Sequence, residues 1–291
     1  MEKIDIQASD GLVLKALYSK VNNPKALVVI VHGMVEHKER YLELIEVLNK
    51  HKYSTIIADL RGHGESINDE YKLGQIGSID QMVSDVKTVM DYIKNDNPNV
   101  KTYLYSHSMG TLIARAFIKK YSFEIEKLIL SGTVAYKPGC WLGVFAAKMK
   151  SKGKGKDKYS TLLYRMSNNG SKSEDVSWLS YNEKNVKSFM DDPLCGFKFT
   201  NYSNYVLFSM TYNLHKHEKN SVNDKLKILS ISGADDRTTN HTRGVKDSVK
   251  HLKKEGFNDV KYIEYHLMKH EILAEENKND VFSDIVSFFN S

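Results

Sequence analysis

The sequence has no long hydrophobic run, few cysteines and little excess charge of either sign. No apolar stretch approaches the ~20 residues that a membrane-spanning helix needs. The first residues alternate charged and apolar side chains and lack the apolar centre of a signal peptide. The two cysteines, Cys140 and Cys195, form no metal-type cluster, and without a secretion signal we expect free thiols. These features favour the reducing cytoplasm.

The net charge of +6 is modest, and its scattered lysines do not favour nucleic-acid binding. The 291 residues are enough for one large α/β domain, or for one core with an insertion. One biased segment, from Lys148 to Lys158, alternates lysine with methionine, serine, glycine and aspartate. We interpret it as a solvated loop. The alternative is peripheral membrane contact, in which each lysine contributes about 1 kcal/mol with anionic headgroups.

Strands alternate with helices along most of the chain. Apolar runs predict strands at 4–6, 12–18, 26–31, 53–58, 127–130, 227–232 and 260–265, and a further strand that begins near residue 101. Helical spacing predicts helices at 41–48, from a cap at Ser78 to about 93, after Ser108, at 243–254 and at 280–289. This alternation predicts an α/β fold with a mostly parallel, doubly wound sheet.

The alternation fails from about residue 134 and returns at about residue 225. The intervening segment contains polar turns and clusters of aromatic residues and methionines. The simplest organisation is one core, formed by residues 1–133 and 225–291, with a largely helical cap at 134–224. The cap is then an insertion after the sixth strand and lies over the carboxyl edge of the sheet.

Ser108 lies on a predicted sharp turn between a strand and a helix. Such a turn exposes a serine hydroxyl at the top of a sheet, and it needs small flanking residues. Here the flanks are Ser106 and Gly110, so the motif departs from Gly-x-Ser-x-Gly at its first position. Taken alone, the pentapeptide is equally compatible with an ordinary turn that carries incidental serines.

A serine nucleophile needs a base to accept its proton and an acid to orient that base. Two later loops, each just after a strand, supply Asp235 or Asp236 and then His270, in the chain order expected for a doubly wound hydrolase. Singly, each residue is more often a turn former or a surface histidine. Three matches in order favour a catalytic triad.

An oxyanion hole needs two backbone N–H groups aimed at one point. We predict that Met109, directly after the nucleophile, and Met34, in the loop after strand 26–31, supply them. His32 and His63 are interpreted as residues that brace loops through hydrogen bonds.

The sequence resembles the α/β-hydrolase superfamily, specifically the monoacylglycerol lipase and lysophospholipase group. The matching segments are 32–37, 59–66, 106–110, 191–200, 232–236 and 269–273. The resemblance implies that Ser108 is the nucleophile, His270 the base and Asp236 the acid, because Asp236 matches the Gly-x-x-Asp pattern of the family. It departs from the family at Ser106 and at Arg237, where proline is common. The implied two-step ester hydrolysis requires no metal or organic cofactor.

The apolar bulk of the cap, together with the resemblance, favours a single-chain lipid ester as substrate: a monoacylglycerol or a lysophospholipid. We predict an acyl-chain site lined by Trp141, Phe145, Phe197, Phe199 and Met210. The alternative is that these residues form the cap's own core.

Other functions remain open at this point. The fold can serve a short-chain or aromatic esterase, a thioesterase, or a ligand-binding protein without catalysis. An aminopeptidase would need acidic cap residues to bind a free amino terminus. The candidates are Glu174, Asp175, Glu183, Asp191 and Asp192.

Overall fold

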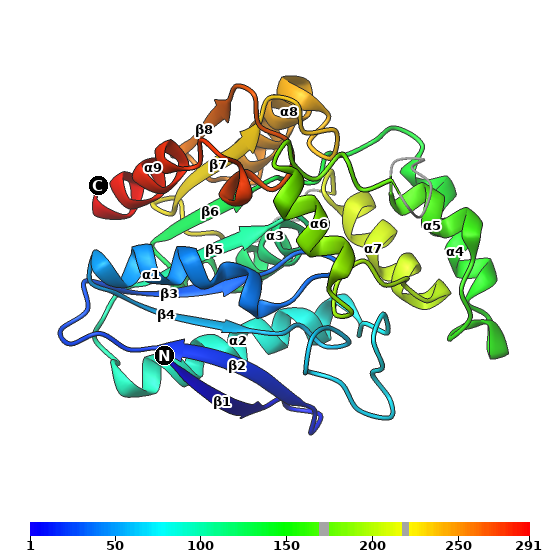
Figure 1. Cartoon of the computed structure of the whole chain (residues 1–291), viewed down its shortest axis with the longest axis horizontal. Coiled ribbons are helices and arrows are strands. Elements are labelled where there is room, and N and C mark those ends of the chain that lie inside the picture. The colour runs from blue at the N-terminus through cyan, green and yellow to red at the C-terminus, as the bar shows by residue number, and fades with distance from the viewer. Residues whose placement is uncertain (169–174, 217–220) are drawn as a thin grey trace.

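The centre of the molecule is an eight-stranded sheet (Figure 1). The computed structural model describes residues 1–168, 175–216 and 221–291. The strand order is β1-β2-β4-β3-β5-β6-β7-β8; the pairs β1–β2 and β2–β4 are antiparallel and all others are parallel. This confirms the predicted fold class. The strands are Glu2–Gln7 (β1), Val13–Ser19 (β2), Ala26–Val31 (β3), Tyr53–Ala58 (β4), Thr102–His107 (β5), Lys127–Ser131 (β6), Lys227–Gly233 (β7) and Val260–Tyr265 (β8).

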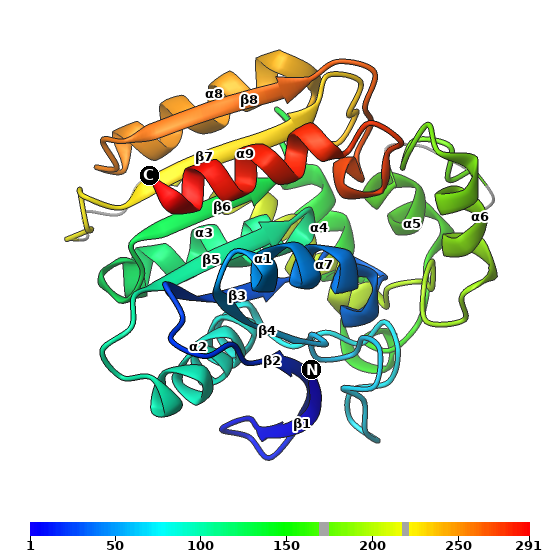
Figure 2. The same ribbon diagram turned by 60° about the vertical axis from the view of Figure 1, so that its left-hand side comes forward.

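Helices cover both faces of the sheet (Figure 2). The helices α2, α3 and α8 share one apolar cluster with the strands, and α1 and α9 share another. Strand β3 is buried along its whole length, as its uninterrupted apolar sequence predicts. Ser78 caps α2 as predicted, because its hydroxyl accepts from the Gln81 N–H. The core helices are Leu42–Lys50 (α1), Ile79–Asp96 (α2), Met109–Tyr121 (α3), His241–Lys254 (α8) and Asn279–Asn290 (α9), with 3-10 turns at Lys38–Tyr41 (η1), Ser122–Glu124 (η2) and Ile272–Ala274 (η4).

Between β6 and β7 the chain leaves the sheet and forms a helical cap beyond the carboxyl ends of the parallel strands (Figure 1). This agrees with the predicted insertion after the sixth strand, whereas its limits at 134 and 224 remain a prediction. Helix α4 packs along α7, with Gly143 against the Phe208 ring. The cap elements are Cys140–Lys150 (α4), Gly153–Gly155 (η3), Thr161–Ser167 (α5), Glu183–Asp191 (α6) and Asn201–Asn213 (α7). Within the described ranges, no helix has the length and apolar character needed to cross a membrane.

The carboxyl edge of the sheet gathers loops from distant parts of the chain. Strands β3, β5, β7 and β8 run parallel, so their carboxyl ends lie at this edge and the loops that follow them begin there. The fold thus collects the predicted functional loops beneath the cap.

Candidate active site

Ser108 occupies the turn between β5 and α3. Its φ of +49° lies in the left-handed region, which a residue other than glycine adopts only when its surroundings hold it there. A Cβ added at Gly110 would lie 2.5 Å from the Val31 carbonyl oxygen, so the turn admits no side chain there. Ser106 is buried, and its hydroxyl donates to the Ile129 carbonyl oxygen over 3.0 Å. The serine that replaces the usual glycine therefore fits, because its one polar group has a partner on β6.

Ser108, His270 and Asp236 form a hydrogen-bonded chain. His270 Nε2 lies 2.8 Å from Ser108 Oγ, and His270 Nδ1 lies 2.8 Å from Asp236 Oδ2. The histidine and the aspartate are buried. This arrangement provides a nucleophile, a base in contact with it, and an acid that fixes the orientation of the base.

In the buried pair of His270 and Asp236, each residue stabilises the charged form of the other. Burial disfavours the imidazolium, but the Asp236 carboxylate outweighs this effect and raises the pKa of His270. Burial also disfavours the carboxylate, but the charge and hydrogen bond of His270 keep the pKa of Asp236 below its ordinary value. The Thr238 N–H contributes by donating to Asp236 Oδ1 over 2.7 Å. Asp236 therefore stays ionised beside the imidazole.

The structure separates the two candidate acids. Asp235 turns toward the cap, where its carboxylate accepts a 3.1 Å hydrogen bond from the Tyr181 hydroxyl. Asp236 alone of the two contacts His270. This geometry agrees with the choice that the resemblance implied.

The two predicted oxyanion donors lie beside Ser108. Met109 begins α3, so its N–H has no acceptor within the helix. Met34 follows Gly33, where an added Cβ would lie 3.0 Å from Ser108 Cβ. The N–H of Gly33 is already used, since it donates to the Glu36 carboxylate. Among the described residues, the Met34 N–H has no acceptor, which leaves it available to a substrate oxygen.

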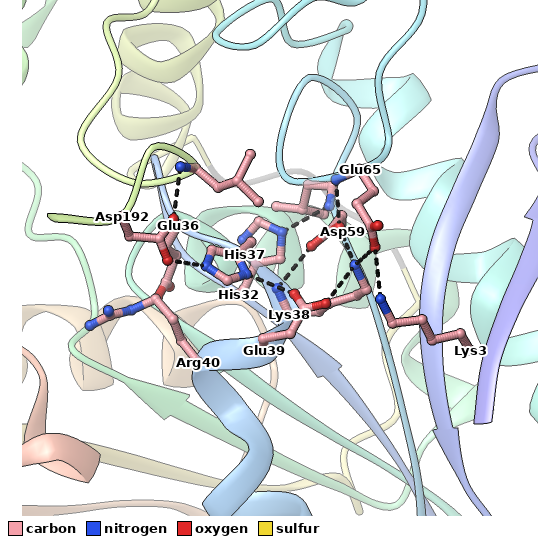
Figure 3. Close-up of polar contacts among 12 residues, drawn as sticks. Lys3, His32, Glu36, His37, Lys38, Glu39, Arg40, Asp59, Glu65 and Asp192 are labelled. Carbon is pink, nitrogen blue, oxygen red and sulfur yellow. Dashed lines mark hydrogen bonds and ion pairs between the residues drawn. The ribbon is translucent and has the colours of Figure 1, made fainter. Parts of the chain in front are cut away.

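Buried polar contacts hold the loop after β3 in place (Figure 3). His32 accepts from the Leu60 N–H over 2.8 Å, which is the bracing role predicted for it. Lys38, only 1 % exposed, pairs with Asp59 at 2.7 Å and with Glu65 at 2.6 Å. Burial opposes the charge of Lys38, but these carboxylates outweigh it and raise its pKa. The loop is thus tied to the loop after β4.

Two further rings contact the His270 imidazole. The centroid of His107 lies 4.8 Å away and that of Trp178 lies 5.2 Å away. Burial, followed by the charge of His270, lowers the pKa of His107 to about 3, so His107 is neutral. Sequence reasoning missed both residues. His107 could have been found from its place before the nucleophile, whereas no local pattern marks Trp178.

Two cavities in the described part of the chain open onto Ser108. One, which we name the His270 cavity, has a volume of about 220 Å³ and includes His270 in its wall. The other, the α4–α7 cavity, has about 300 Å³ and extends between those helices. Ser108, Met34 and Trp178 border both cavities. A ligand at the serine hydroxyl can therefore extend in two directions.

The five cap residues predicted to line an acyl site have different environments. Phe197 and Phe199 line the His270 cavity. Trp141 and Phe145 point outward from α4 with 55 % and 61 % of their surface exposed, and they line neither cavity. Met210 is buried in the apolar core and also lines neither. The structure thus brings only two of the five to the site.

Two groups of side chains within the described residues have metal-ligand chemistry. His37, Asp192 and Cys195 form one group, in which both ring nitrogens of His37 already bond carboxylates. His215 and His251 form the other with Asp247. Their rings stack 3.7 Å apart with only 8° between planes. Nearly parallel rings cannot both direct an in-plane nitrogen lone pair at one ion, so this arrangement is not a preformed metal site.

Comparisons with known proteins agree with this geometry. Residues 22–277 match the family described as serine aminopeptidase, S33. The chain is 30% identical to the monoacylglycerol lipase of Mycolicibacterium smegmatis over 110 residues, 38% of each chain. It is also 30% identical to the monoglyceride lipase of Mus musculus over 190 residues, 64% of this chain and 58% of that one. The matches thus span about two fifths and three fifths of these relatives.

A solved structure agrees along nearly the whole chain. The thermostable carboxyl esterase from Bacillus coagulans, in complex with glycerol, superimposes with a TM-score of 0.87 at 24% identity. The match covers 99% of this chain and 97% of that one.

The fold and the loops at its carboxyl edge define an α/β-hydrolase. The match over residues 22–277 makes the assignment narrower: the chain belongs to the serine aminopeptidase S33 family. The group suspected from the sequence motifs agrees with the monoglyceride lipases among its relatives.

Proposed function

We propose that the protein is a serine carboxylic-ester hydrolase that acts on a single-chain lipid ester, either a monoacylglycerol or a lysophospholipid. The observation that carries the proposal is the Ser108–His270–Asp236 chain at the junction of two cavities with many apolar walls. The similarity to monoglyceride lipases supports it.

The proposed reaction has two steps. As the Ser108 hydroxyl attacks the ester carbonyl, His270 accepts its proton and the Met34 and Met109 N–H groups bind the oxyanion. His270 then donates that proton to the departing alcohol, which leaves an acyl group on Ser108. Water attacks the acyl-enzyme by the same route and releases the fatty acid. Each oxyanion donor contributes about 10²–10³ in rate.

The walls of the cavities favour a lipid. The α4–α7 cavity is lined largely by apolar groups, among them Val134, Leu207 and Phe208. A pocket of this kind gains ~25 cal/mol for each Å² of apolar surface that a chain buries. A substrate with one acyl chain fits the α4–α7 cavity, which has the more apolar wall of the two, and this is why we propose a monoacyl lipid. A short-chain or aromatic esterase would leave it unfilled.

The geometry disfavours an aminopeptidase. Glu36 and Glu271 border the His270 cavity, but both are paired with Arg40, at 3.3 Å and 2.7 Å. The candidate residues Asp175, Glu183, Asp191 and Asp192 line neither cavity. Glu174, the remaining candidate, lies outside the described residues. Within the described residues, a substrate ammonium group would therefore meet carboxylates that already have a cationic partner.

We also propose that the enzyme is cytoplasmic and that it contacts membranes peripherally through the cap. Helix α4 exposes Trp141, Leu142 and Phe145, and exposed lysines occur from Lys148, in the last turn of this helix, to Lys158, beyond its end. An apolar helix face beside lysines matches an anionic membrane surface. Asn201 donates to the Gly155 carbonyl oxygen over 2.9 Å, so this segment is held to α7. The enzyme would thus bind at the membrane surface, where a monoacyl lipid substrate is located.

A paired experiment tests the proposed function. The protein is treated with a fluorophosphonate, the adduct is located by mass spectrometry, and hydrolysis is measured for p-nitrophenyl esters, monoacylglycerols, lysophospholipids and peptide amides. We expect the adduct on Ser108 and rates that rise with acyl length. An adduct with activity only on acetyl or aryl esters would contradict the lipid assignment. Without an adduct, or with an acyl-enzyme that never turns over, the nucleophile or the hydrolase assignment fails.

A further inference from the structure

Trp178 lies at the junction of the two cavities, where the acyl arm and the alcohol arm of a bound ester must take different directions. It borders both the His270 cavity and the α4–α7 cavity, and its ring contacts the His270 imidazole. The other groups that border both cavities come from the oxyanion loop, the nucleophile and the end of α5. Among the described residues that border both cavities, Trp178 is the only one with an aromatic ring. Its ring therefore lies between the two directions in which a bound ligand can extend from Ser108.

The chemistry assigns one arm of the ester to each cavity. The departing alkoxy oxygen must come within hydrogen-bond reach of His270 Nε2, which protonates it. Of the two cavities, the one named for His270 has this histidine in its wall. The α4–α7 cavity borders Met109, whose N–H is a proposed oxyanion donor, and its wall is more apolar. The alcohol thus belongs in the His270 cavity and the acyl chain in the α4–α7 cavity.

A short segment holds Trp178 in place. We call residues 177–182 the strap. Glu275, which is buried, accepts hydrogen bonds from the Ser180 hydroxyl at 2.8 Å, the Tyr181 N–H at 3.0 Å and the Asn182 N–H at 3.2 Å. The Glu271 N–H donates to the Leu179 carbonyl oxygen over 2.8 Å.

The anchors of the strap lie on the loop that also carries His270. Besides Glu271 and Glu275, this loop contributes Lys269, whose ammonium donates to the Ser177 carbonyl oxygen over 2.6 Å. The Lys269 N–H in turn donates to Glu275 over 2.9 Å. The ring of Trp178 is therefore positioned relative to His270 through a few residues of one loop, and it also packs against the apolar cluster of Leu179, Phe189 and Cys195.

We propose that Trp178 is the specificity-determining residue of this site: it divides the acyl side from the alcohol side, and Glu275 positions it. This inference rests on the proposed ester hydrolase. It predicts that the enzyme distinguishes esters whose two arms are exchanged, even when their composition and hydrophobicity are the same. Loss of the ring removes this distinction, whereas loss of a simple packing residue slows all substrates equally.

Isomeric esters provide the test. Ethyl octanoate carries its long chain on the acyl side, and octyl acetate carries it on the alcohol side. We expect wild-type kcat/KM to favour ethyl octanoate, and Trp178→Ala to reduce that preference about tenfold or more, since such pocket contacts decide 10- to 200-fold discrimination. Trp178→Phe should retain most of it. Glu275→Gln, which replaces one acceptor oxygen by a donor, should shift the preference in the same direction as Trp178→Ala.

Two variants narrow one cavity each and serve as matched controls. A Cβ at Gly143 would lie 3.3 Å from both Met166 Cε and Phe208 Cδ2, so Gly143→Leu intrudes on the α4–α7 cavity. Val176→Phe intrudes on the His270 cavity. The first should selectively slow ethyl octanoate, and the second should selectively slow octyl acetate.

The outcomes separate this proposal from the proposed function. If Trp178→Ala changes both isomers by one factor, or if wild type does not distinguish them, Trp178 does not divide the site although the hydrolase assignment stands. Opposite effects of Gly143→Leu and Val176→Phe would also overturn the assignment of the arms. If wild type hydrolyses neither isomer and a fluorophosphonate does not label Ser108, the proposed function itself fails.

Discussion

The core side and the cap side of the site are built by different means. On the core side, buried charges meet fixed partners, such as Lys38 with Asp59 and His270 with Asp236. On the cap side, α4 presents Phe145 and its neighbours to solvent. The contrast indicates a division of tasks. The triad and its supporting charges lie where burial makes each lost polar contact costly, whereas the outer face of α4 leaves apolar side chains exposed.

The largest effect should come from the nucleophile. Ser108→Ala should reduce kcat on any ester by about 10⁶, as removal of a triad serine does elsewhere. Because the φ of +49° is imposed by the surrounding turn, the fold should survive. Steady-state kinetics on a p-nitrophenyl ester measures kcat, and thermal unfolding followed by circular dichroism shows whether the fold is retained. Substantial residual activity would show that the core side does not carry the chemistry.

The next effect concerns pH and the acid. His270 accepts a proton only when it is neutral, and although burial opposes its charge, Asp236 raises its pKa. Activity should therefore fall as the pH drops, with a midpoint above the ordinary histidine value of about 6.5. Asp236→Asn should lower kcat by about 10⁴ and move the midpoint to lower pH, because burial then dominates. A kcat/KM profile from about pH 5 to 9 tests this, and an unchanged midpoint would contradict it.

A third prediction compares the loss of stability when a buried lysine and an exposed lysine are each replaced. Lys38→Met leaves the buried Asp59 carboxylate without its cation, so the free energy of unfolding should fall by about 3–5 kcal/mol. The matched control is Lys20→Met, which removes an exposed, solvent-screened pair with Asp96 and should leave the free energy of unfolding nearly unchanged. Urea denaturation followed by fluorescence measures both. Equal losses would erase the contrast between the interior of the core and its surface.

The smallest effect is expected on the outer face of the cap. Phe145→Glu should leave the unfolding free energy within about 0.5 kcal/mol of wild type, because the side chain is exposed. It should nevertheless weaken binding to vesicles that contain phosphatidylserine by about tenfold or more. Sedimentation with vesicles gives the affinity, and hydrolysis of a water-soluble ester gives the control. Unchanged vesicle binding would sink the proposed membrane contact.

The local patterns around Ser108, Asp236 and His270 could be predicted from the sequence because each residue lies in the turn or loop that follows a strand. Their order in the chain then predicts that the three residues come together, since parallel strands bring their carboxyl ends to one edge of the sheet. The alternation of strands and helices similarly predicts the sheet without knowledge of any long-range contact.

The cap could not be predicted in the same way. An apolar residue on a helix can face inward or outward, and only the packing of α4 on α7 decides that Trp141 and Phe145 face solvent. The position of Trp178 depends on Glu275, almost a hundred residues later, and no pattern near the tryptophan encodes that contact. The burial of Lys38 likewise depends on partners from a different loop.

The hydrogen bond between Ser108 and His270 joins residues 162 positions apart in the chain. Contacts of such sequence separation form slowly, because a long loop must close before they contribute. The histidine follows β8, the strand at one end of the sheet order. A partly folded chain can thus contain the nucleophile turn and most of the sheet and still lack its base. During refolding, recovery of esterase activity would report the docking of this last strand, later than the return of helical circular dichroism.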